Sequence, residues 1–491
     1  MYVGSQNQLK AYDAYLLAHG YTIEQLIDYA SDALLKHISS YEHIGILVGP
    51  GNNGADGLSL ALKLDQLDKD VCLYFIGDPS RFSEGNRYYF YQCLDHIKMV
   101  HLDEALIDES ELSQYDVIVD GFFGFGLNSA PRGLYKSMID LINTSYQGEV
   151  IAIDCPTGLD CNTGTPYSTV LFAHKTITLS ALKEGFLNPE SQVFTGEVIV
   201  EELAIDNPFM EAGLSLLFDK KEAESLIKQR RYDGYKNMYG IDLLICGSST
   251  YRGAPFLASM GCLYSGAGIV KVMSDEKVID MLPLKIPECI GISRSKPITK
   301  EELSHYDAIL IGCGLSLEKE SYLLTSDVLL NASSPLVIDA DALTILSTHM
   351  SLLEDINVPV ILTPHIGEFK RLWPMEEGYD LMEEADQFAK TYNVILVLKG
   401  PHTIITDGKE HYRIASGNKA MAVGGMGDTL AGMITSFLGQ GYAPLSAALL
   451  ATYIHGFTGD ILARKRYSVL PEELSKHIPM AMHILSEKLE E

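Results

Sequence analysis

The stretch GGMGDTLAG, Gly424 to Gly432, places three glycines directly before a carboxylate at the expected start of a helix. Glycine carries no side chain that would keep a ligand away from the backbone. The first N–H groups of a helix lack intrahelical partners and attract anions. Asp428 then lies beside a bound phosphate, where it can accept a proton from a hydroxyl group. The stretch therefore predicts a phosphoryl-transfer site.

Four other segments of the second half join an apolar run to polar or glycine residues. They are IGCGLS (311–316), IDADAL (338–343), LTPHIGEFKRL (362–372) and VLKGPHTIITDG (397–408). Because ligands of α/β sheets bind at the carboxyl ends of the strands, we expect these segments to converge on Asp428. Each also has a simpler interpretation. His365 or Asp339 can cap a helix, and Lys399 can be a surface charge.

Short apolar runs alternate with amphipathic helical patterns in both halves of the chain. This alternation predicts parallel sheets covered by helices on both faces. The candidate strands are 44–48, 71–76, 117–119, 150–153, 176–179 and 197–203, then 243–246, 268–273, 308–311, 336–338, 360–362, 394–398 and the hairpin strand 403–406. The expected helices are 58–67, 134–142, 428–438, 444–463 and 472–489.

The segment AIDNPFMEAG (204–213) interrupts this alternation with a proline and a glycine. A chain of 491 residues has room for two or three domains of ordinary size. We therefore predict two α/β domains, residues 1–212 and 213–491, each a three-layer sandwich.

Three strand ends in the first half carry polar residues followed by glycines. Asn52, Asn53 and Asp56 lie in GPGNNGADG (49–57), Asp120 lies in VDGFFGFGLNSAPRG (119–133), and Asp154 lies in VIAIDCPTGLDCNTG (150–164). A single G-x-G-x-x-G match is weak evidence for a nucleotide site, and one aspartate at a strand end is more often a turn former. Three such ends together favour one small-molecule site at the carboxyl edge of a sheet.

The composition is that of a soluble globular protein, with 47% hydrophobic and 21% charged residues. The formal charge is −28 without a Lys/Arg-rich run, which argues against nucleic-acid binding. The eight cysteines form no CxxC pair, as in reduced cytoplasmic proteins. The N-terminal residues do not read as a signal peptide, and no apolar run reaches the roughly 18 residues of a membrane span.

Residues 1 to about 210 resemble the NAD(P)H-hydrate epimerase domain through NNGADG, VDGFFGFGL, AIDCPTGLDCNTG and AHKTITLSALKEGFLNP (173–189). The resemblance implies a Rossmann-like fold, with Asp154 as the catalytic base and potassium bound by Asn53, Asp120 and Thr157. It also implies that the hydrated nucleotide contacts Asn52, Asn53, Gly54, Ala55, Asp56, Gly124, Phe125, Gly126, Leu127, Asn128, Ser129, Ala130 and Asp154.

Two positions depart from that family's usual pattern. Ala55 stands where the family usually has a second glycine, and Asn128 stands where many members carry arginine. If the backbone at Ala55 were left-handed, its β-carbon would cost on the order of 1 kcal/mol.

Residues 220–491 resemble the ribokinase-like superfamily, whose members share a GxGD turn, and most closely the ADP-dependent NAD(P)H-hydrate dehydratase. The shared motifs are a glycine-rich stretch (247–272), DAD, TPHxGE, LKG and GGxGDxLAG. The resemblance implies that Asp428 is the catalytic base and that the hydrate contacts Ala254, Gly314, His365 and Asp428. It implies that the adenine nucleotide contacts Lys399, Gly400, Pro401, His402, Thr403 and Gly427.

Together the two resemblances imply a bifunctional enzyme that repairs hydrated nicotinamide nucleotides. One domain would interconvert the R and S hydrates of NADH or NADPH with potassium, and the other would dehydrate the S form with magnesium and ADP, giving AMP and phosphate. The family's tendency to form multimers implies a homo-oligomer. Two alternatives stay open: a vitamin or sugar kinase, which would accumulate a stable phosphate ester, and an N-terminal half that only binds its ligand.

Overall fold

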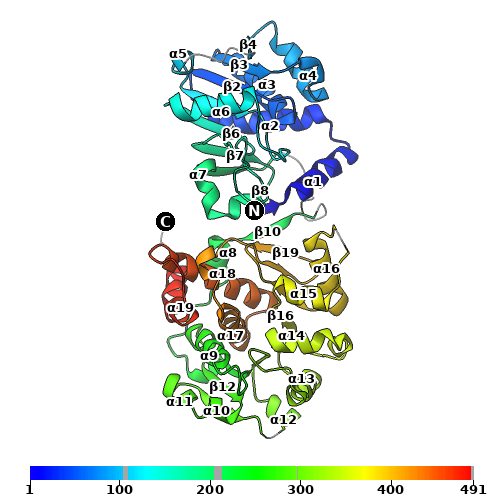
Figure 1. Ribbon diagram of the computed structural model, residues 1–491, viewed down its shortest axis with the longest axis vertical. Coiled ribbons are helices and arrows are strands. Elements are labelled where there is room, and N and C mark those ends of the chain that lie inside the picture. The colour runs from blue at the N-terminus through cyan, green and yellow to red at the C-terminus, as the bar shows by residue number, and fades with distance from the viewer. Residues whose placement is uncertain (103–108, 204–208, 210–212, 296, 377, 488–491) are drawn as a thin grey trace. The chain divides into compact units, whose positions relative to one another are not determined.

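The computed structural model describes residues 1–491 except 103–108, 204–208, 210–212, 296, 377 and 488–491. The chain divides into two compact units, Met1–Ser215 and Leu216–Glu491, which Figure 1 colours from blue to green and from green to red. Most of the predicted linker 204–213 lies outside the described residues, as do the last residues of the helix expected over 472–489.

In the described part of the N-terminal unit, seven parallel strands form a sheet in the order β4-β3-β2-β5-β6-β7-β9. Ile46 and Leu47 of β2 pack on opposite faces of this sheet, because successive side chains of a strand alternate. The strands are β2 (His43–Val48), β3 (Asp70–Ile76), β4 (Lys98–Leu102), β5 (Val117–Gly121), β6 (Glu149–Ile153), β7 (Lys175–Leu179) and β9 (Glu197–Glu201).

Helices cover both faces of the N-terminal sheet. One face packs against α2 (Ile23–Ile38), α3 (Asn52–Asp65) and α4 (Glu84–Cys93). The other packs against α5 (Glu109–Leu112) and α6 (Leu134–Ser145). The fold also holds α1 (Gln6–Ala18), α7 (Gln192–Thr195) and the strands β1 (Tyr2–Gly4) and β8 (Leu182–Lys183), which pair in parallel. The three-layer α/β arrangement predicted for this half is therefore confirmed.

Helices α1 and α2 were not among the predicted elements, yet both begin at clear start signals. Ser5 and Gln8 form a reciprocal capping box at the start of α1, and Thr22 and Gln25 form one at the start of α2. Such boxes satisfy two N–H groups that a helix leaves unpaired. They fix where α1 begins, and α1 carries Asp13 toward the polar end of the sheet.

The C-terminal unit has the same layered α/β arrangement, and its sheet has more strands. Its parallel strands follow the order β13-β12-β11-β14-β15-β16-β17, and the antiparallel strands β18 and β19 and the parallel strand β10 continue it. They are β10 (Ser215–Phe218), β11 (Ile241–Ile245), β12 (Ile269–Ser274), β13 (Ile290–Ser293), β14 (Ala308–Ile311), β15 (Leu336–Ile338), β16 (Val360–Leu362), β17 (Ile395–Leu398), β18 (Ile404–Thr406) and β19 (His411–Ile414).

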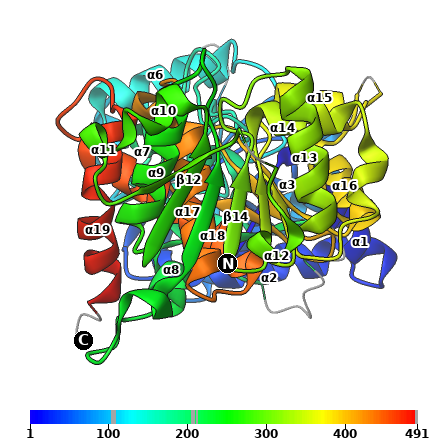
Figure 2. The ribbon, with the colours of Figure 1, turned by 90° about the horizontal axis from the view of Figure 1, so that it is seen from below.

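Two hydrophobic cores lie on opposite faces of this sheet. Leu244 belongs to the core formed with α9 (Ala254–Tyr264), α17 (Met426–Gly439), α18 (Pro444–Ala463) and α19 (Pro471–Ser486). Its neighbour Leu243 belongs to the core formed with α13 (Lys319–Asn331), α14 (Ala340–Ser347), α15 (Ile366–Leu372) and α16 (Leu381–Tyr392). Figure 2 shows these two helix layers on either side of β12 and β14. The predicted three-layer arrangement is confirmed here too.

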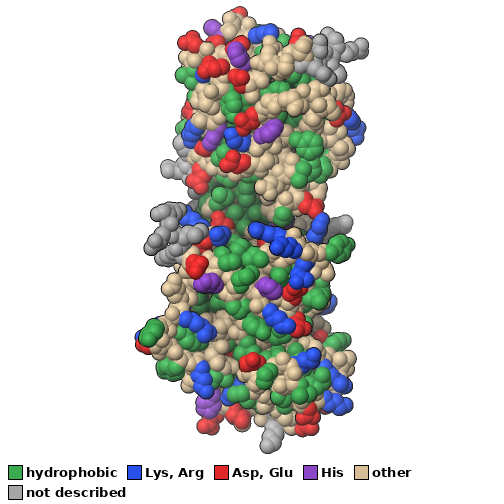
Figure 3. All heavy atoms as spheres, turned by 90° about the vertical axis from the view of Figure 1, so that its left-hand side faces the viewer, with side chains coloured by type: hydrophobic (Ala, Val, Ile, Leu, Met, Phe, Trp, Pro, Cys, Tyr) green, Lys and Arg blue, Asp and Glu red, His purple; other side chains and the backbone are tan. Residues whose placement is uncertain are grey.

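Several short helices complete the C-terminal unit, namely α8 (Lys220–Leu226), α10 (Glu276–Ile279), α11 (Leu282–Lys285) and α12 (Lys300–Leu303). Helix α18 has the predicted bounds, and α17 begins two residues before the predicted start. In the described residues, no helix combines the length and the apolar character that crossing a bilayer would require. All eight cysteines are free and buried. On the face drawn in Figure 3, acidic and basic side chains are intermingled.

Candidate active sites

The first candidate site lies at the carboxyl ends of adjacent parallel strands of the C-terminal unit. Cys313 follows β14, Asp339 follows β15, His365 follows β16 and Lys399 follows β17. The backbones of His365 and Lys399 form a parallel β-bridge, and the N–H of Lys399 donates to the Pro364 carbonyl at 2.8 Å. The predicted convergence of these strand ends is therefore seen, as expected for a parallel sheet.

Lys399 and Asp339 form a partly buried ion pair at the centre of this edge, with the Lys399 side chain 21% exposed. Lys399 Nζ lies 2.8 Å from Asp339 Oδ1, and the Asp339 side chain is 3% exposed. Burial opposes the charged form of Lys399, but the Asp339 carboxylate outweighs it and raises the pKa of the ammonium. Lys399 is thus a paired, charged group and not a free surface lysine. Asp339 makes no side-chain cap to α14, so the capping interpretation of this residue is wrong.

Asp428 lies beside this pair in the first turn of α17. One ligand atom each of Asp428, Asp339 and Cys313 lies within 4.8 Å of the others. Burial, followed by the charge of Asp339, raises the pKa of Asp428 to about 7. A carboxyl group with a pKa near neutrality is well matched to proton transfer.

The start of α17 is open to a ligand. Gly425 has a φ of 95°, a left-handed conformation that glycine adopts without cost. No side chain caps the helix. A β-carbon on Gly427 would lie 3.2 Å from Lys399 Nζ, so the lysine and the helix start face one another. Free N–H groups beside an ammonium are suited to a phosphate group.

The residues expected to hold the hydrated nucleotide fall into two groups. Ala254 and Gly314 are adjacent, since a β-carbon on Gly314 would lie 2.9 Å from the Ala254 Cβ. Gly314 directly follows Cys313 and so connects this pair to Asp428. His365 is exposed at the same sheet edge, but no contact between its side chain and Ala254 or Gly314 is seen.

The His365 ring has a structural role at the start of α15. Its Nδ1 accepts hydrogen bonds from Gly367 N at 2.9 Å and Glu368 N at 3.2 Å. Glu368 completes the capping box by accepting from the backbone N–H of His365 at 2.8 Å. The helix-capping interpretation is therefore confirmed. The other ring nitrogen, Nε2, lies 3.6 Å from the Glu368 carboxylate.

Two substitutions separate these roles of His365. We expect His365→Ala to lower the free energy of unfolding of the C-terminal unit by about 0.5–2 kcal/mol through loss of the cap. His365→Ser retains a capping oxygen and should recover most of that stability. If the ring also contacts substrate, both variants raise KM for that substrate. Thermal unfolding and steady-state kinetics check this, and a normal KM in the serine variant would limit His365 to capping.

The proposed nucleotide loop, Lys399 to Thr403, connects β17 to β18. Thr403 Oγ1 donates to the Gly400 carbonyl at 3.2 Å, and Arg413 donates to the His402 carbonyl at 3.1 Å. Burial, followed by the charge of Arg413, lowers the pKa of His402, which favours its neutral form near pH 7. Pro401 is exposed at the tip of the loop. The loop therefore starts at the Lys399 ammonium and presents a neutral ring beyond it.

The second candidate site lies at the carboxyl ends of β5 and β6 in the N-terminal unit. Asp154 follows β6 with a φ of 66°, a left-handed conformation that is uncommon for residues other than glycine. Its Oδ1 accepts from the N–H of Leu179 at 3.2 Å and pairs with Lys183. Its Oδ2 accepts from the N–H of Phe125 at 3.3 Å. Asp154 thus contacts the glycine-rich loop 124–130 directly.

Asp120, at the end of β5, is fully buried among hydrogen-bond donors. The Thr157 hydroxyl donates to Asp120 Oδ1 and the Thr157 N–H donates to Oδ2, each at 2.7 Å. Burial still raises the pKa of Asp120 to about 6. The nearby Asn53 amide donates to the Ile153 carbonyl at 3.2 Å and accepts from the Gly124 N–H at 3.3 Å. Asp120 and Thr157 are therefore in direct contact, while Asn53 reaches the same strand ends from α3.

The remaining predicted epimerase residues surround this group. Asn52 to Asp56 form the first turn of α3, and a β-carbon on Gly124 would lie 2.8 Å from the end of the Asn53 amide and 3.2 Å from Asp154 Oδ2. Ala55 is helical and is not among the residues with positive φ. The strain considered for Ala55 is therefore absent. Asn128 and Ser129 are exposed on the loop.

Both units of the chain are similar to known proteins. A family model described as NAD(P)H-hydrate dehydratase matches residues 243–480, and one described as YjeF-related protein N-terminus matches residues 23–185. A bifunctional NAD(P)H-hydrate repair enzyme from Escherichia coli is 31% identical over 457 residues, which cover 91% of this chain and 86% of that protein. The chain belongs to the family of bifunctional NAD(P)H-hydrate repair enzymes.

Other members and solved structures support this assignment. The bifunctional NAD(P)H-hydrate repair enzyme of Moorella thermoacetica is 30% identical over 470 residues, covering 91% of this chain and 88% of that one. A ribokinase-like superfamily protein from Enterococcus faecalis has a TM-score of 0.51 and 31% identity, covering 56% of this chain and 97% of its own. The similarity to the repair enzymes spans both units, whereas this structure matches the ribokinase-like part alone.

Sequence reasoning missed two ionisable residues of the second candidate site. Lys183 pairs with Asp154 and is 1% exposed. Asp13 of α1 interacts electrostatically with both. The residue is exposed at the surface, and partial desolvation of its carboxyl group, followed by the charge of Asp154, raises its pKa. Lys183 lies in LSALKEGF (179–186), where a lone lysine in an apolar segment was the available signal. No local pattern pointed to Asp13.

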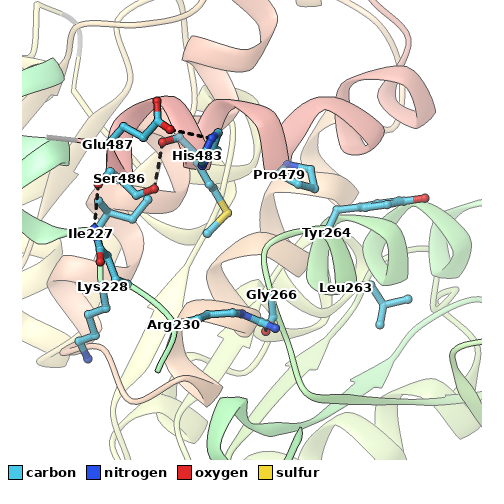
Figure 4. A pocket seen from close by; sticks show the side chains of 12 residues that line it. Ile227, Lys228, Arg230, Leu263, Tyr264, Gly266, Pro479, His483, Ser486 and Glu487 are labelled. Carbon is cyan, nitrogen blue, oxygen red and sulfur yellow. Dashed lines mark hydrogen bonds and ion pairs between the residues drawn. The ribbon is translucent and has the colours of Figure 1, made fainter. Parts of the chain in front are cut away.

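A surface pocket of the C-terminal unit lies away from the catalytic groups. It is lined at the C-terminal end of α9 by Leu263 and Tyr264, and at α19 by Pro479 and His483 (Figure 4). Ala254 begins α9 at the opposite end, about ten residues or 15 Å along the helix. None of the predicted site residues lines this pocket, so we do not assign the reaction to it.

Proposed function

We propose that this chain repairs hydrated NADH and NADPH through two activities, one in each unit. The N-terminal unit would interconvert the R and S hydrates, and the C-terminal unit would dehydrate the S form at the expense of ADP. The observation that carries the proposal is the placement of Asp428, with a pKa of about 7, beside Lys399 and the uncapped start of α17. Membership of the repair-enzyme family supports both assignments.

In the dehydratase reaction, Asp428 accepts the proton of the hydroxyl on the nicotinamide ring. That oxygen attacks the terminal phosphorus of ADP, and the bond to the AMP oxygen breaks. Lys399 and the N–H groups at the start of α17 stabilise the negative charge on the transferring phosphoryl group. The phosphorylated ring then expels phosphate, which is a far better leaving group than hydroxide, and loses a proton to restore the dihydropyridine.

Magnesium would reach the dehydratase site together with ADP. The only cluster of potential metal ligands among the described residues is Cys313, Asp339 and Asp428. It includes a thiol, whereas magnesium prefers oxygen ligands, and its Asp339 is engaged by Lys399. These residues do not form a complete magnesium-binding site, so the nucleotide phosphates would supply the ligands.

The epimerase reaction requires the hydroxyl-bearing carbon to lose and regain its configuration. We assign the proton transfers to Asp154, which would accept the hydroxyl proton as the bond from that carbon to the ring nitrogen opens and leaves an aldehyde. The proton passes to the nitrogen, the aldehyde rotates, and closure on its other face reverses the transfers. No atom is gained or lost. The Gly124–Ala130 loop, which contacts Asp154 at Phe125, would hold the ring.

Potassium fits the residues near Asp120. Asp120 is buried, with a pKa raised by that burial to about 6, and no cationic side chain pairs with it in the described part of the chain. The carboxylate, the Thr157 hydroxyl and the Asn53 amide offer hard oxygen ligands. Bound potassium would neutralise Asp120 and tie the ends of β5 and β6 to α3.

One assay tests the whole proposal. Purified protein is mixed with both NADH hydrate epimers and ADP, and the recovery of reduced-nicotinamide absorbance is followed. We expect a fast phase from the S form and a slower phase limited by epimerisation, with AMP and free phosphate as products. Replacing potassium with sodium should slow only the second phase. A stable phosphate ester would instead indicate a small-molecule kinase, and the lack of a second phase would leave the N-terminal unit as a binding module.

A further inference from the structure

The buried Lys183 holds one oxygen of Asp154 and leaves the other toward the substrate loop. Its Nζ donates to the carbonyls of Leu179 at 3.0 Å and Ala181 at 3.3 Å, and its third donor pairs with Asp154 Oδ1. An ammonium has three donors, so all of them are engaged within the protein. Lys183 therefore has no N–H left for the substrate and acts through Asp154.

The two oxygens of Asp154 have different surroundings. Oδ1 is held by Lys183, by the Leu179 N–H at 3.2 Å and by the Thr178 hydroxyl at 3.5 Å. Oδ2 accepts a single bond of 3.3 Å, from Phe125 N in the glycine-rich loop. It also lies 3.2 Å from where a β-carbon on Gly124 would be. Lys183, Leu179 and Thr178 thus fix Oδ1 of Asp154, whereas Oδ2 faces the Gly124–Ala130 loop.

Backbone hydrogen bonds and strand pairing position both Lys183 and Asp154. Lys183 pairs with Gly4 in the register of β8 with β1. The backbone N–H of Asp154 donates to the Ile177 carbonyl at 2.8 Å, which fixes the Asp154 backbone. Residues other than glycine rarely adopt the left-handed backbone that Asp154 has. Strain of this kind persists where surrounding contacts impose a particular side-chain direction.

We propose that Lys183 is the positioning residue of the epimerase reaction, holding Oδ1 of Asp154 so that Oδ2 alone exchanges the proton with the substrate. This inference rests on the proposed epimerase role of Asp154. The chemistry favours it because an ionised carboxylate in a buried site needs a paired cation. Two more carboxyl groups, Asp13 and Asp56, interact electrostatically with Asp154.

The experiment compares Lys183→Met with Lys183→Arg in the full-length chain. The readout is the rate at which R-enriched NADH hydrate relaxes to the epimer mixture without ADP, measured from pH 5 to 9. We expect Lys183→Met to lower kcat about 100-fold, with KM changed by less than about threefold, as for loss of an effective base. The acid limb of the pH profile, where kcat falls as the pH drops, should lie at higher pH in Lys183→Met than in the parent. Lys183→Arg restores the cation and should return kcat to within about tenfold of the parent, with the parental acid limb.

Control measurements distinguish the loss of the Lys183 ammonium from unfolding of the protein and from an effect of Asp13. Dehydratase activity on the S hydrate reports the C-terminal unit in every preparation, and circular dichroism reports whether the N-terminal unit is folded. The groups facing Asp154 that also titrate are Asp13, Asp56, Lys183, Cys155 and Cys161, so Asp13→Asn is measured alongside. If Asp13 set the acid limb, this variant would move it and Lys183→Met would not, which would overturn the inference.

Two further outcomes decide between this inference and the function on which it rests. A parental kcat and pH profile in Lys183→Met would refute the positioning role of Lys183. If folded Lys183→Arg recovered no more activity than Lys183→Met, the cation would not be the cause, and the inference would fail as well. Asp154→Asn is the separate test of the base: if it exchanged epimers within about tenfold of the parent, the proposed role of Asp154 would be wrong.

Discussion

Replacing Asp428 with asparagine should lower the dehydration rate by about 10²–10⁴-fold, the usual contribution of a positioned base. Asparagine has nearly the same shape but cannot accept the hydroxyl proton. The start of α17 and the Lys399 ammonium would remain, because no side chain caps the helix and Lys399 pairs with Asp339 and not with Asp428. We therefore expect ADP to bind to the variant with an affinity close to that of the parent.

Two measurements on one preparation check the Asp428 prediction. Stopped-flow absorbance gives the rate with S hydrate and ADP, and calorimetry gives the affinity for ADP. The epimerase rate of the same chain is the matched control and should not change. Turnover within about tenfold of the parent would contradict the base role, and loss of ADP binding would indicate a structural effect of the substitution.

The pH profile adds an independent check on Asp428. Its pKa is raised to about 7, first by burial and then by the charge of Asp339. A base acts in its ionised form, so kcat/KM for dehydration should fall as the pH drops below about 7 and should level off above it. The residual activity of Asp428→Asn should lack this limb.

Most of the fold was predictable because the strands are buried on both faces. Runs such as 308–311, 336–338 and 360–362 are continuously apolar, and the structure has strands with these bounds. Helix α1 was not predicted because its apolar residues form only a weak stripe, and α2 was missed although its apolar residues share one face. Their capping boxes were nevertheless readable in the sequence. Strand β4 was missed because most of its side chains are exposed or only partly buried.

The candidate sites were predictable where the residues adjoin a glycine turn or the end of a strand. Asp428, Lys399, Asp154 and Asp120 were found in this way. The local sequence could not indicate which of them pair, because Lys399 and Asp339 are 60 residues apart and meet only when the sheet forms. Lys183 was missed for the same reason, since its partner lies at the end of another strand. Contacts between distant strand ends depend on sheet order, which the sequence pattern does not reveal.

Replacing Lys399 with methionine should have the second largest effect, because it leaves the Asp339 carboxylate buried without a cation. Breaking a buried ion pair by removing one partner typically costs about 3–5 kcal/mol. We expect the thermal transition of the C-terminal unit to move down accordingly. The remaining charge of Asp339, which already raises the pKa of Asp428, would act without the opposing ammonium. The acid limb of dehydration should therefore move to higher pH.

A double variant separates the structural and catalytic contributions of Lys399. In Lys399→Met with Asp339→Asn, the charge of Asp339 is removed together with its partner, so the thermal transition should recover most of the loss. ADP affinity should stay low, because the ammonium that faces Gly427 at the start of α17 is absent in both variants and phosphate recognition depends on it. Differential scanning calorimetry and ADP titration test the two halves of this argument. If ADP affinity returned together with stability, Lys399 would serve the fold alone, and the phosphate would have to be held by the helix start without it.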